Sequence, residues 1–279
     1  MTHMLQFYDN NRASSLLALA AAGGLLTALP AAAGEACDLS DGYADDLVSY
    51  VSEVEACLSD AQAFAPEMEN GVFAETNAAR EQAGLTPLNR RSSLDQAARA
   101  HALDMAKRNY AGHSDLEGRS HVYRMRALDR QVLASATGAN VVVLDAGVDA
   151  EKVFDMIGSD TANRENIQRE GFTDTGIGIA QADGKLYVVQ MLTTVDGELE
   201  NPLPLQIAKS TSFTPRVNTD MFRTAGWNLT DEAGNRLAGG KLMRLHSDSI
   251  DFDDKAYLDV LVELDTDTYV LRGPAVSRR

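Results

Sequence analysis

The chain has 279 residues, of which 44% are hydrophobic, and this allows one large or two modest domains with a well-formed core. It carries 25 basic against 41 acidic residues, so its formal net charge is −16. A charge of this sign repels phosphate backbones and anionic lipid surfaces. We therefore expect a folded protein that does not bind nucleic acid.

The first 33 residues have the pattern of a secretory signal peptide. Arg12 precedes a leucine-rich and small-residue run over residues 14–29, and Pro30 and three alanines follow it. The run is too short and too interrupted by glycine for a transmembrane helix. We predict a signal peptide over residues 1–33 with cleavage after Ala33. The mature protein is then secreted or periplasmic, with no transmembrane anchor.

The two cysteines, Cys37 and Cys57, both lie in the predicted mature chain. An exported protein with two cysteines most simply forms one disulfide bond, here Cys37–Cys57. The alternatives are two free thiols or a lipid anchor on Cys37, although the preceding residues match a lipobox poorly. Apolar residues at helical spacing predict an amphipathic helix over residues 40–62. The disulfide and this helix would form an N-terminal segment over residues 34–65.

Helices and strands are predicted to alternate after this segment. Gly84 supplies a left-handed cap that ends one helix, Ser92 or Ser93 caps the next, and Asp149 precedes a further helix. The predicted helices cover residues 66–83, 92–110, 122–128 and 150–157. The predicted strands cover residues 140–144, 175–181 and 186–193, with a hairpin turn at residues 182–184.

The pattern changes beyond the proline-bearing segment 201–204, which we interpret as a linker. Alternating apolar residues and turn residues follow it and predict a small all-β region over residues 205–279. Its predicted strands cover residues 227–229, 241–245, 258–264 and 269–271. Its predicted turns lie at Gly234-Asn235, Gly239-Gly240 and residues 265–267.

Seven short motifs occur in order between residues 75 and 192. They are Asn77-x-x-Arg80-x-x-x-Gly84-Leu85, Ala98-x-x-His101-Ala102-x-x-Met105-Ala106, Tyr110-x-x-His113, Gly138-Ala139-Asn140, Asn163-Arg164-Glu165-Asn166-Ile167, Gly176-Ile177-Gly178 and Tyr187-Val188-Val189-Gln190. Together they resemble the bacterial branch of the CAP superfamily (cysteine-rich secretory, antigen 5 and pathogenesis-related-1 proteins, with an SCP-like domain). The resemblance implies an α+β fold in which residues 66–195 form a three-layer α-β-α sandwich. The region 205–279 would then be a small all-β C-terminal appendage.

The resemblance also implies a cleft lined by two histidines and one or two glutamates, which in many members hold a divalent metal. His113 matches the first histidine, whereas the glutamate falls at Ala139 and the second histidine at Asn163. A methyl group cannot bind a metal, and a neutral amide is a weak zinc ligand. We therefore expect a degenerate site at His113, Ala139 and Asn163, with no metal and no cofactor. His113 is left as the one candidate catalytic residue.

Four other sets of residues are candidates for chemistry. His101 lies between alanines on a helix, where a histidine more often packs and donates one hydrogen bond. A replacement metal site is conceivable at His113, Asp115, Glu117 and His121, and a loose calcium site at Asp251, Asp253, Asp254, Asp265 and Asp267. His246 lies among Ser247, Asp248 and Ser249, but no nucleophile-elbow motif accompanies a Ser-His-Asp set there.

The predicted function is that of an exported CAP-domain protein without enzymatic activity. The resemblance implies binding of a small hydrophobic or cell-envelope-derived ligand, or of a partner. Two alternatives stay open: a protease-like hydrolase that uses the cleft around His113, and an adhesive or scaffolding module. The oligomeric state is left open by the sequence.

Overall fold

A computed structural model describes residues 37–246, 250, 252 and 255–278. The predicted signal peptide lies outside the described residues. The first described helix, α1 (Leu47–Leu58), is shorter than the predicted helix over 40–62, because Asp46 caps its N-terminus by accepting a hydrogen bond from the Ser49 N–H. A disulfide joins Cys37 to Cys57, as predicted. It fastens the start of the described chain to the inner face of α1, where Cys57 is buried.

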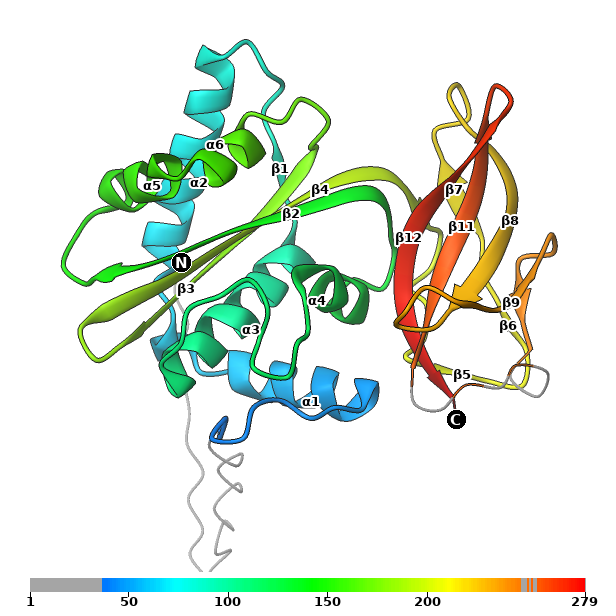
Figure 1. The fold of residues 1–279 in the computed structure, drawn as a ribbon, viewed down its shortest axis with the longest axis horizontal. Helices are drawn as coiled ribbons and strands as arrows, with labels where there is room; N and C mark the ends of the chain where they lie inside the picture. Colours follow the sequence, from blue (N-terminus) through cyan, green and yellow to red (C-terminus); the bar gives the residue numbers. More distant parts are fainter. Residues whose placement is uncertain (1–36, 247–249, 251, 253–254, 279) are drawn as a thin grey trace, which may run out of the picture. The chain divides into compact units, whose positions relative to one another are not determined.

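Two layers of helices enclose a sheet, which confirms the predicted three-layer α-β-α sandwich (Figure 1). One layer contains α2 (Pro66–Gln82), α5 (Ala150–Ser159) and α6 (Thr161–Ile167). The other contains α1, α3 (Ser92–Arg108) and α4 (His121–Leu128), and a 3₁₀ turn, η1 (Ala61–Ala63), precedes α2. None of the helices in the described part of the chain is long and apolar enough to cross a membrane.

The helix ends confirm two of the three predicted caps. Gly84 follows α2 with φ of 73°, and Asp149 caps α5 through its carboxylate, as predicted. The predicted serine cap of α3 is wrong. Arg91 is the N-cap residue and forms no side-chain cap. The Ser93 hydroxyl donates to the Asp129 carboxylate instead of capping the helix. Helix α6 was not predicted.

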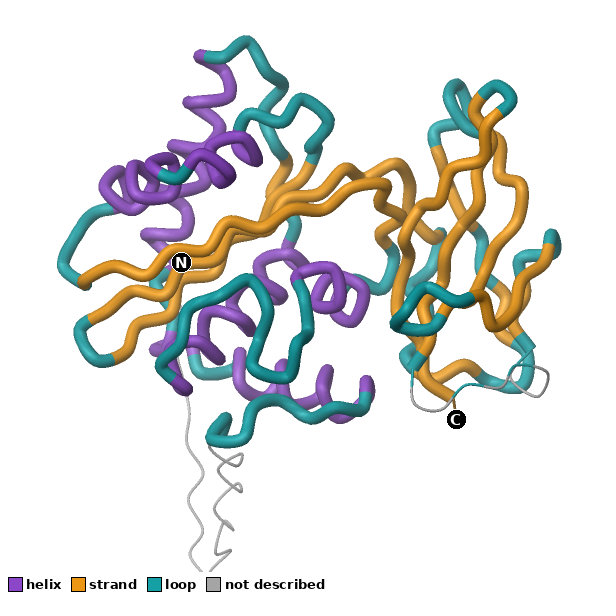
Figure 2. The backbone as a smooth tube through the Cα atoms, viewed as in Figure 1, coloured by secondary structure: helices purple, strands orange, loops and turns teal. Residues whose placement is uncertain are grey.

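The sandwich sheet has the strand order β1-β3-β4-β2. Its strands are β1 (Asn89–Arg90), β2 (Val132–Asp145), β3 (Asp174–Ala182) and β4 (Lys185–Leu199). β2, β3 and β4 are long antiparallel neighbours that run between the helix layers (Figure 2). Glycine is required at positions 176 and 178, where a Cβ atom would lie 2.2 Å from the backbone of α3. This close approach explains the Gly-Ile-Gly motif.

The region after residue 205 is made of strands, as predicted, and no helix is found among its described residues. Antiparallel pairing joins β9, β8, β11 and β12, and a second apolar core lies against them. The strands are β5 (Gln206–Ile207), β6 (Thr211–Ser212), β7 (Pro215–Val217), β8 (Arg223–Thr230), β9 (Arg236–Gly240), β10 (Arg244–Leu245), β11 (Ala256–Leu264) and β12 (Asp267–Arg278).

Two predictions in this region are wrong. Gly239 and Gly240 lie in β9 rather than in a turn, because they pair with Asn228 and Trp227 of β8. The predicted strand over 241–245 shrinks to Arg244–Leu245. Trp227 Nε1 donates to the Leu242 carbonyl over 2.6 Å and holds that loop in a bend.

The strands after residue 205 continue from the sandwich through several contacts. β12 pairs with β2 at Arg272 and Ala134, and β7 pairs with the end of β4. The buried Arg126 of α4 donates to the carboxylate of Asp259 and to two backbone carbonyls of β11 and β12, each over 2.7 Å. The division into a domain over 66–195 and an extension over 205–279 remains a proposal, which a truncation can test.

Candidate functional site

A cleft of about 450 Å³ lies where the α3–α4 loop, strand β2 and helices α5 and α6 meet. It is lined by the three positions that the family resemblance singled out: His113 of the loop, Ala139 of β2 and Asn163 of α6. The other lining residues are mostly apolar or neutral, namely Val141, Val142, Val143, Met156, Ser159, Asp160, Ala162 and Asn166. The fold thus brings three positions that are distant in sequence to one concave site.

A chain of buried amides supports the wall of this cleft. Asn166 Nδ2 donates to Asn140 Oδ1 over 2.9 Å, and Asn140 Nδ2 donates to Gln190 Oε1 over 3.0 Å. Gln190 Nε2 then donates to the Thr76 hydroxyl over 2.9 Å. Because Asn140 and Gln190 are buried, satisfied hydrogen bonds of this kind hold their side chains in one arrangement. The network gives a physical reason for Asn140 in the Gly138-Ala139-Asn140 motif and for Gln190 in the Tyr187-Val188-Val189-Gln190 motif.

The imidazole of His121 lies in a region of low polarity near the cleft histidine. Burial is the main cause that lowers its pKa to about 4, and the charges of Arg124 and His113 lower it further. A hydrogen bond to the Thr137 backbone opposes this shift. The His121 ring is therefore neutral at pH 7 and cannot form an ion pair with a carboxylate.

The donors of the cleft do not fit the divalent metal that the family resemblance implies. His113 offers one imidazole, Asn163 offers a neutral amide, and Ala139 offers no donor atom. The Asp160 carboxylate lines the cleft but already caps α6, accepting the Asn163 N–H over 2.9 Å. A stable site needs three or more strong protein ligands, so no step of chemistry is assigned to a metal here.

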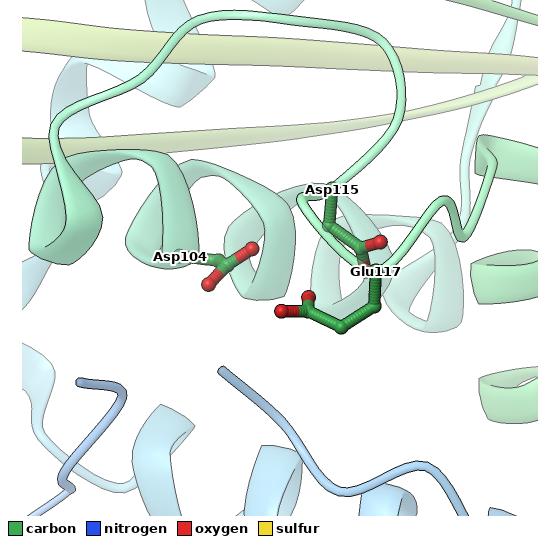
Figure 3. Close-up of side chains that lie close together, drawn as sticks. All are labelled: Asp104, Asp115 and Glu117. Carbon is green, nitrogen blue, oxygen red and sulfur yellow. The ribbon is translucent and has the colours of Figure 1, made fainter. Parts of the chain in front are cut away.

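Three carboxylates on the α3–α4 side come together outside the cleft. Oxygen atoms of Asp104, Asp115 and Glu117 lie within 4.8 Å of one another, with Asp104 on α3 and the other two on the following loop (Figure 3). Arg108 donates to Asp104 over 2.7 and 2.8 Å and to Glu117 over 2.6 and 2.8 Å. Arg119 donates to Asp115 over 2.7 Å and to Glu117 over 3.0 Å.

These arginines make the carboxylate group a salt-bridge network rather than a metal site. Arg119 also donates to the backbone carbonyls of Tyr43 and Ala44, so the network holds the N-terminal segment against the α3–α4 loop. The replacement metal site weighed from the sequence is not assembled, because the buried Asp115 carboxylate is bound to Arg119.

His101 has the structural role expected from its position between alanines. Its side chain is 1% exposed, and its Nε2 lies 2.7 Å from the Gly112 carbonyl oxygen, which can only accept a hydrogen bond. Burial is the main cause that lowers the pKa of His101 to about 3, with a contribution from the charge of Arg124. The ring is therefore neutral, protonated on Nε2, and has no access to a substrate.

The remaining sequence hypotheses fall mostly outside the described residues. Residues 247–249, which would complete a Ser-His-Asp set with His246, are among those not described, as are Asp251, Asp253 and Asp254 of the calcium hypothesis. Asp265 and Asp267 lie in and beside the β11–β12 turn.

Two features of the site were missed at the sequence level. Asp160 followed by a helix-compatible stretch is an N-cap signal that could have revealed α6. The amide network joins residues that are far apart along the chain, and no local pattern predicts it.

One family model matches the central part of the chain. The model of the cysteine-rich secretory protein family (CAP) matches residues 73–192. No curated protein matches the sequence.

Among solved structures, an outer surface protein of Borrelia burgdorferi is 15% identical with a TM-score of 0.42, and the match covers 46% of this chain and 93% of that one. An extracellular protein containing an SCP domain from Bacillus anthracis is 20% identical, with a TM-score of 0.40 and coverage of 51% and 43%. A cysteine-rich secretory protein from Staphylococcus aureus is 19% identical, with a TM-score of 0.36 and coverage of 46% and 39%. The chain thus spans less than half of the last two proteins.

The matched residues include helices α3 to α6, strands β1 to β3, most of β4, and every residue that lines the cleft. Residues 73–192 therefore match the CAP domain of the cysteine-rich secretory protein family, and alanine and asparagine stand at two of the cleft positions.

Proposed function

We propose that this chain is an exported, non-enzymatic binding protein that takes a small hydrophobic or envelope-derived ligand, or part of a partner, in the cleft at His113. The lining of that cleft supports the proposal, because six of its eleven residues are valine, methionine or alanine and the other five offer polar groups. Concave sites of this composition are typical of ligand binding. Ala139 and Asn163 provide neither a general base nor a strong metal ligand.

Export is supported by two independent features. Residues 1–33 have the composition of a signal peptide, and the Cys37–Cys57 disulfide is of the kind that persists in an oxidising compartment. We therefore propose that the mature protein acts outside the cytoplasm, in the periplasm or beyond the cell.

Native mass spectrometry of the chain purified from its own host tests the binding proposal. We expect a retained molecule whose mass is released on denaturation. Ala162→Trp should reduce its occupancy, because residue 162 lines the cleft and is exposed, so a large side chain fills space without disturbing the core. Ala233→Trp, at an exposed turn of the C-terminal strands, is the matched control and should leave occupancy unchanged.

Two results would overturn this assignment. A wild-type protein that carries nothing, and acquires nothing from a lipid extract of the host, has no such ligand. Hydrolytic turnover that disappears in a folded His113→Ala variant would make the chain an enzyme.

A further inference from the structure

The cleft runs along the edge of strand β2. Val141, Val142 and Val143 are consecutive, and successive side chains of a strand point to opposite faces. Val141 and Val143 pack against the core beside α1 and α3, whereas Val142 packs against the core beneath α2 and α5. A cavity that touches all three residues cannot lie over one face of the sheet, so it follows the side of the strand.

Along β2, residues that hydrogen-bond to β4 alternate with residues whose backbone points away from it, and this alternation determines which N–H and C=O groups face the cavity. The Ala146 N–H donates to the Gly184 carbonyl over 2.8 Å at the β2–β4 end of the ladder. In an antiparallel ladder alternate residues bond to the neighbouring strand, and those between them direct N–H and C=O to the opposite side. The register is unbroken from residue 136 to 145, so residues 137, 139, 141, 143 and 145 face away from β4.

One polar contact agrees with this alternation. The Ala139 carbonyl accepts a hydrogen bond from Asn166 Nδ2 over 3.3 Å, and Ala139 belongs to the outward-facing set. Val141 and Val143 are the next two members of that set, and both line the cleft.

The outward side of β2 has little strand pairing within the described part of the chain. β12 pairs there only through Arg272 and Ala134, before the cleft begins. The N–H and C=O groups of Val141 and Val143 therefore form an open edge beside a cavity. Such an edge is a template for an added strand, which gains backbone hydrogen bonds and places alternate side chains in the flanking pockets.

The charge of the lining indicates what such a strand should carry. Asp160 supplies the one carboxylate among the residues that line the cleft, and no lysine or arginine accompanies it. The chain as a whole has a net charge of −16. A basic side chain is therefore favoured over an acidic one at this site.

We propose that the CAP cleft binds an extended peptide segment bearing lysine or arginine, which adds to the edge of β2 opposite Val141 and Val143 with its basic side chain near Asp160. This inference rests on the proposed binding function of the cleft and narrows its ligand to a peptide.

A panel of capped pentapeptides tests the backbone pairing. The panel alternates lysine or arginine with valine, threonine or tyrosine, and each peptide has a partner with every backbone nitrogen methylated. We expect at least one parent peptide to shift the NMR amide resonances of Val141 and Val143, and its methylated partner to leave them in place. The inference is wrong if no peptide shifts them, or if both forms bind equally.

Variants of the protein test the same contacts from the other side. Val143→Pro removes the outward N–H without touching the β4 ladder, and proline is tolerated at a strand edge. We expect about tenfold weaker peptide binding, the scale of one lost backbone hydrogen bond. Val143→Ala keeps that N–H and should bind within about threefold of wild type, because it loses only part of one apolar contact.

Asp160→Asn provides a second test that does not depend on proline. Asparagine retains the cap of α6 but removes the charge. Peptides with lysine or arginine should bind several-fold more weakly to this variant, whereas a peptide with glutamine in their place should be unaffected. Equal weakening of both peptides would contradict the role of Asp160.

The outcomes separate this inference from the proposed function. If a fluorescent fatty acid binds in the cleft and no peptide does, the cleft is a ligand site and the peptide inference falls. If neither probe binds, and the protein carries nothing from its host and acquires nothing from a host lipid extract, both fall. Concentration-dependent dimerisation that Val143→Pro abolishes would show that a second copy of the chain, rather than a peptide, occupies the edge.

Discussion

Single residues decide what the cleft can and cannot do. Ala139 contributes only a methyl group, and the backbone of Asn163 is bonded to Asp160 and Asn140 as part of the helix cap and the amide network. His113 is thus the one imidazole among the lining residues. A lone imidazole binds metal weakly and has no partner to orient it as a base.

Zinc titration tests this reading of the three positions. We expect wild-type protein to show no binding at the cleft tighter than about millimolar, which corresponds to about −4 kcal/mol. Ala139→Glu combined with Asn163→His should create measurable affinity by restoring a carboxylate and a second imidazole. Adding His113→Ala to that double variant should abolish it, as followed by calorimetry.

Micromolar zinc binding by wild type that is lost on His113→Ala would contradict this prediction. Ligands other than the three aligned positions would then complete the site, and the non-enzymatic assignment would need revision.

The buried imidazole of His101 makes stability depend on pH. Its pKa is about 3 in the folded chain and about 6.5 when unfolded, so the unfolded state binds the extra proton between these values. The contribution of His101 to the unfolding free energy is therefore complete above pH 6.5 and is lost as the pH falls toward 3. Between pH 7 and pH 5 this single group should remove on the order of 2 kcal/mol.

Denaturant unfolding of wild type and His101→Gln at pH 7 and pH 5 measures this contribution. We expect the variant to be less stable at pH 7 but to lose less stability on acidification. An identical pH dependence in His101→Gln would show that other groups cause the acid sensitivity.

At the scale of elements, the N-terminal segment is closed on itself by the disulfide and fastened to the CAP domain by hydrogen bonds. The disulfide closes a loop with a sequence separation of 20 residues, and Arg119 binds the carbonyls of Tyr43 and Ala44. The apolar face of α1 lies in the same core as α3 and α4. These contacts make the segment part of the folded domain rather than a tail.

Removal of the disulfide tests its share of this stability. Chain-entropy reasoning gives about 3 kcal/mol for a loop of this length. We expect Cys37→Ala with Cys57→Ala to lower the unfolding free energy by up to that amount, and the oxidised, host-exported protein to have a mass two hydrogens below its reduced form. Labelling of both thiols without reductant would refute the bond in the exported protein.

Local chemistry made several elements predictable from the sequence. Glycine before a proline-bearing stretch predicted the end of α2, and Asp149 predicted the start of α5, because both signals act within one turn of the chain. The motif alignment also predicted that His113, Ala139 and Asn163 would line one cleft. Each of these inferences depends on residues that are close in sequence or fixed by a known motif order.

The parts that could not be predicted depend on contacts between distant residues. Ser93 fails as a cap because its hydroxyl binds Asp129, and Asp115 fails as a metal ligand because Arg119 binds it in the folded loop. The open edge of β2 depends on where β12 stops pairing, which no local pattern of β2 records. Tertiary pairing of polar groups therefore overrides local signals at these places.

At the scale of the whole molecule, the C-terminal strands share apolar contacts with the sandwich. Tyr257 and Ala275 lie in the core beside α3 and α4, and Leu133 of β2 lies in the core of the C-terminal strands. Arg130 donates to the carbonyls of Leu203 and Pro204, so the predicted linker is held in place. The two regions should therefore stabilise each other even if each can fold.

Truncation after residue 200 tests whether the CAP domain folds without the extension. We expect residues 34–200 to keep a cooperative thermal transition, because the helix layers, the sheet from β1 to β4 and the amide network are all retained. Its midpoint should fall below that of residues 34–279, since Tyr257 and Ala275 no longer cover the core beside α4. Arg126 loses Asp259 but gains access to water, so it does not remain as a buried unpaired charge. A truncated chain that is soluble only as a molten or aggregated species would show that the C-terminal strands complete the core, and the boundary near residue 200 would be wrong.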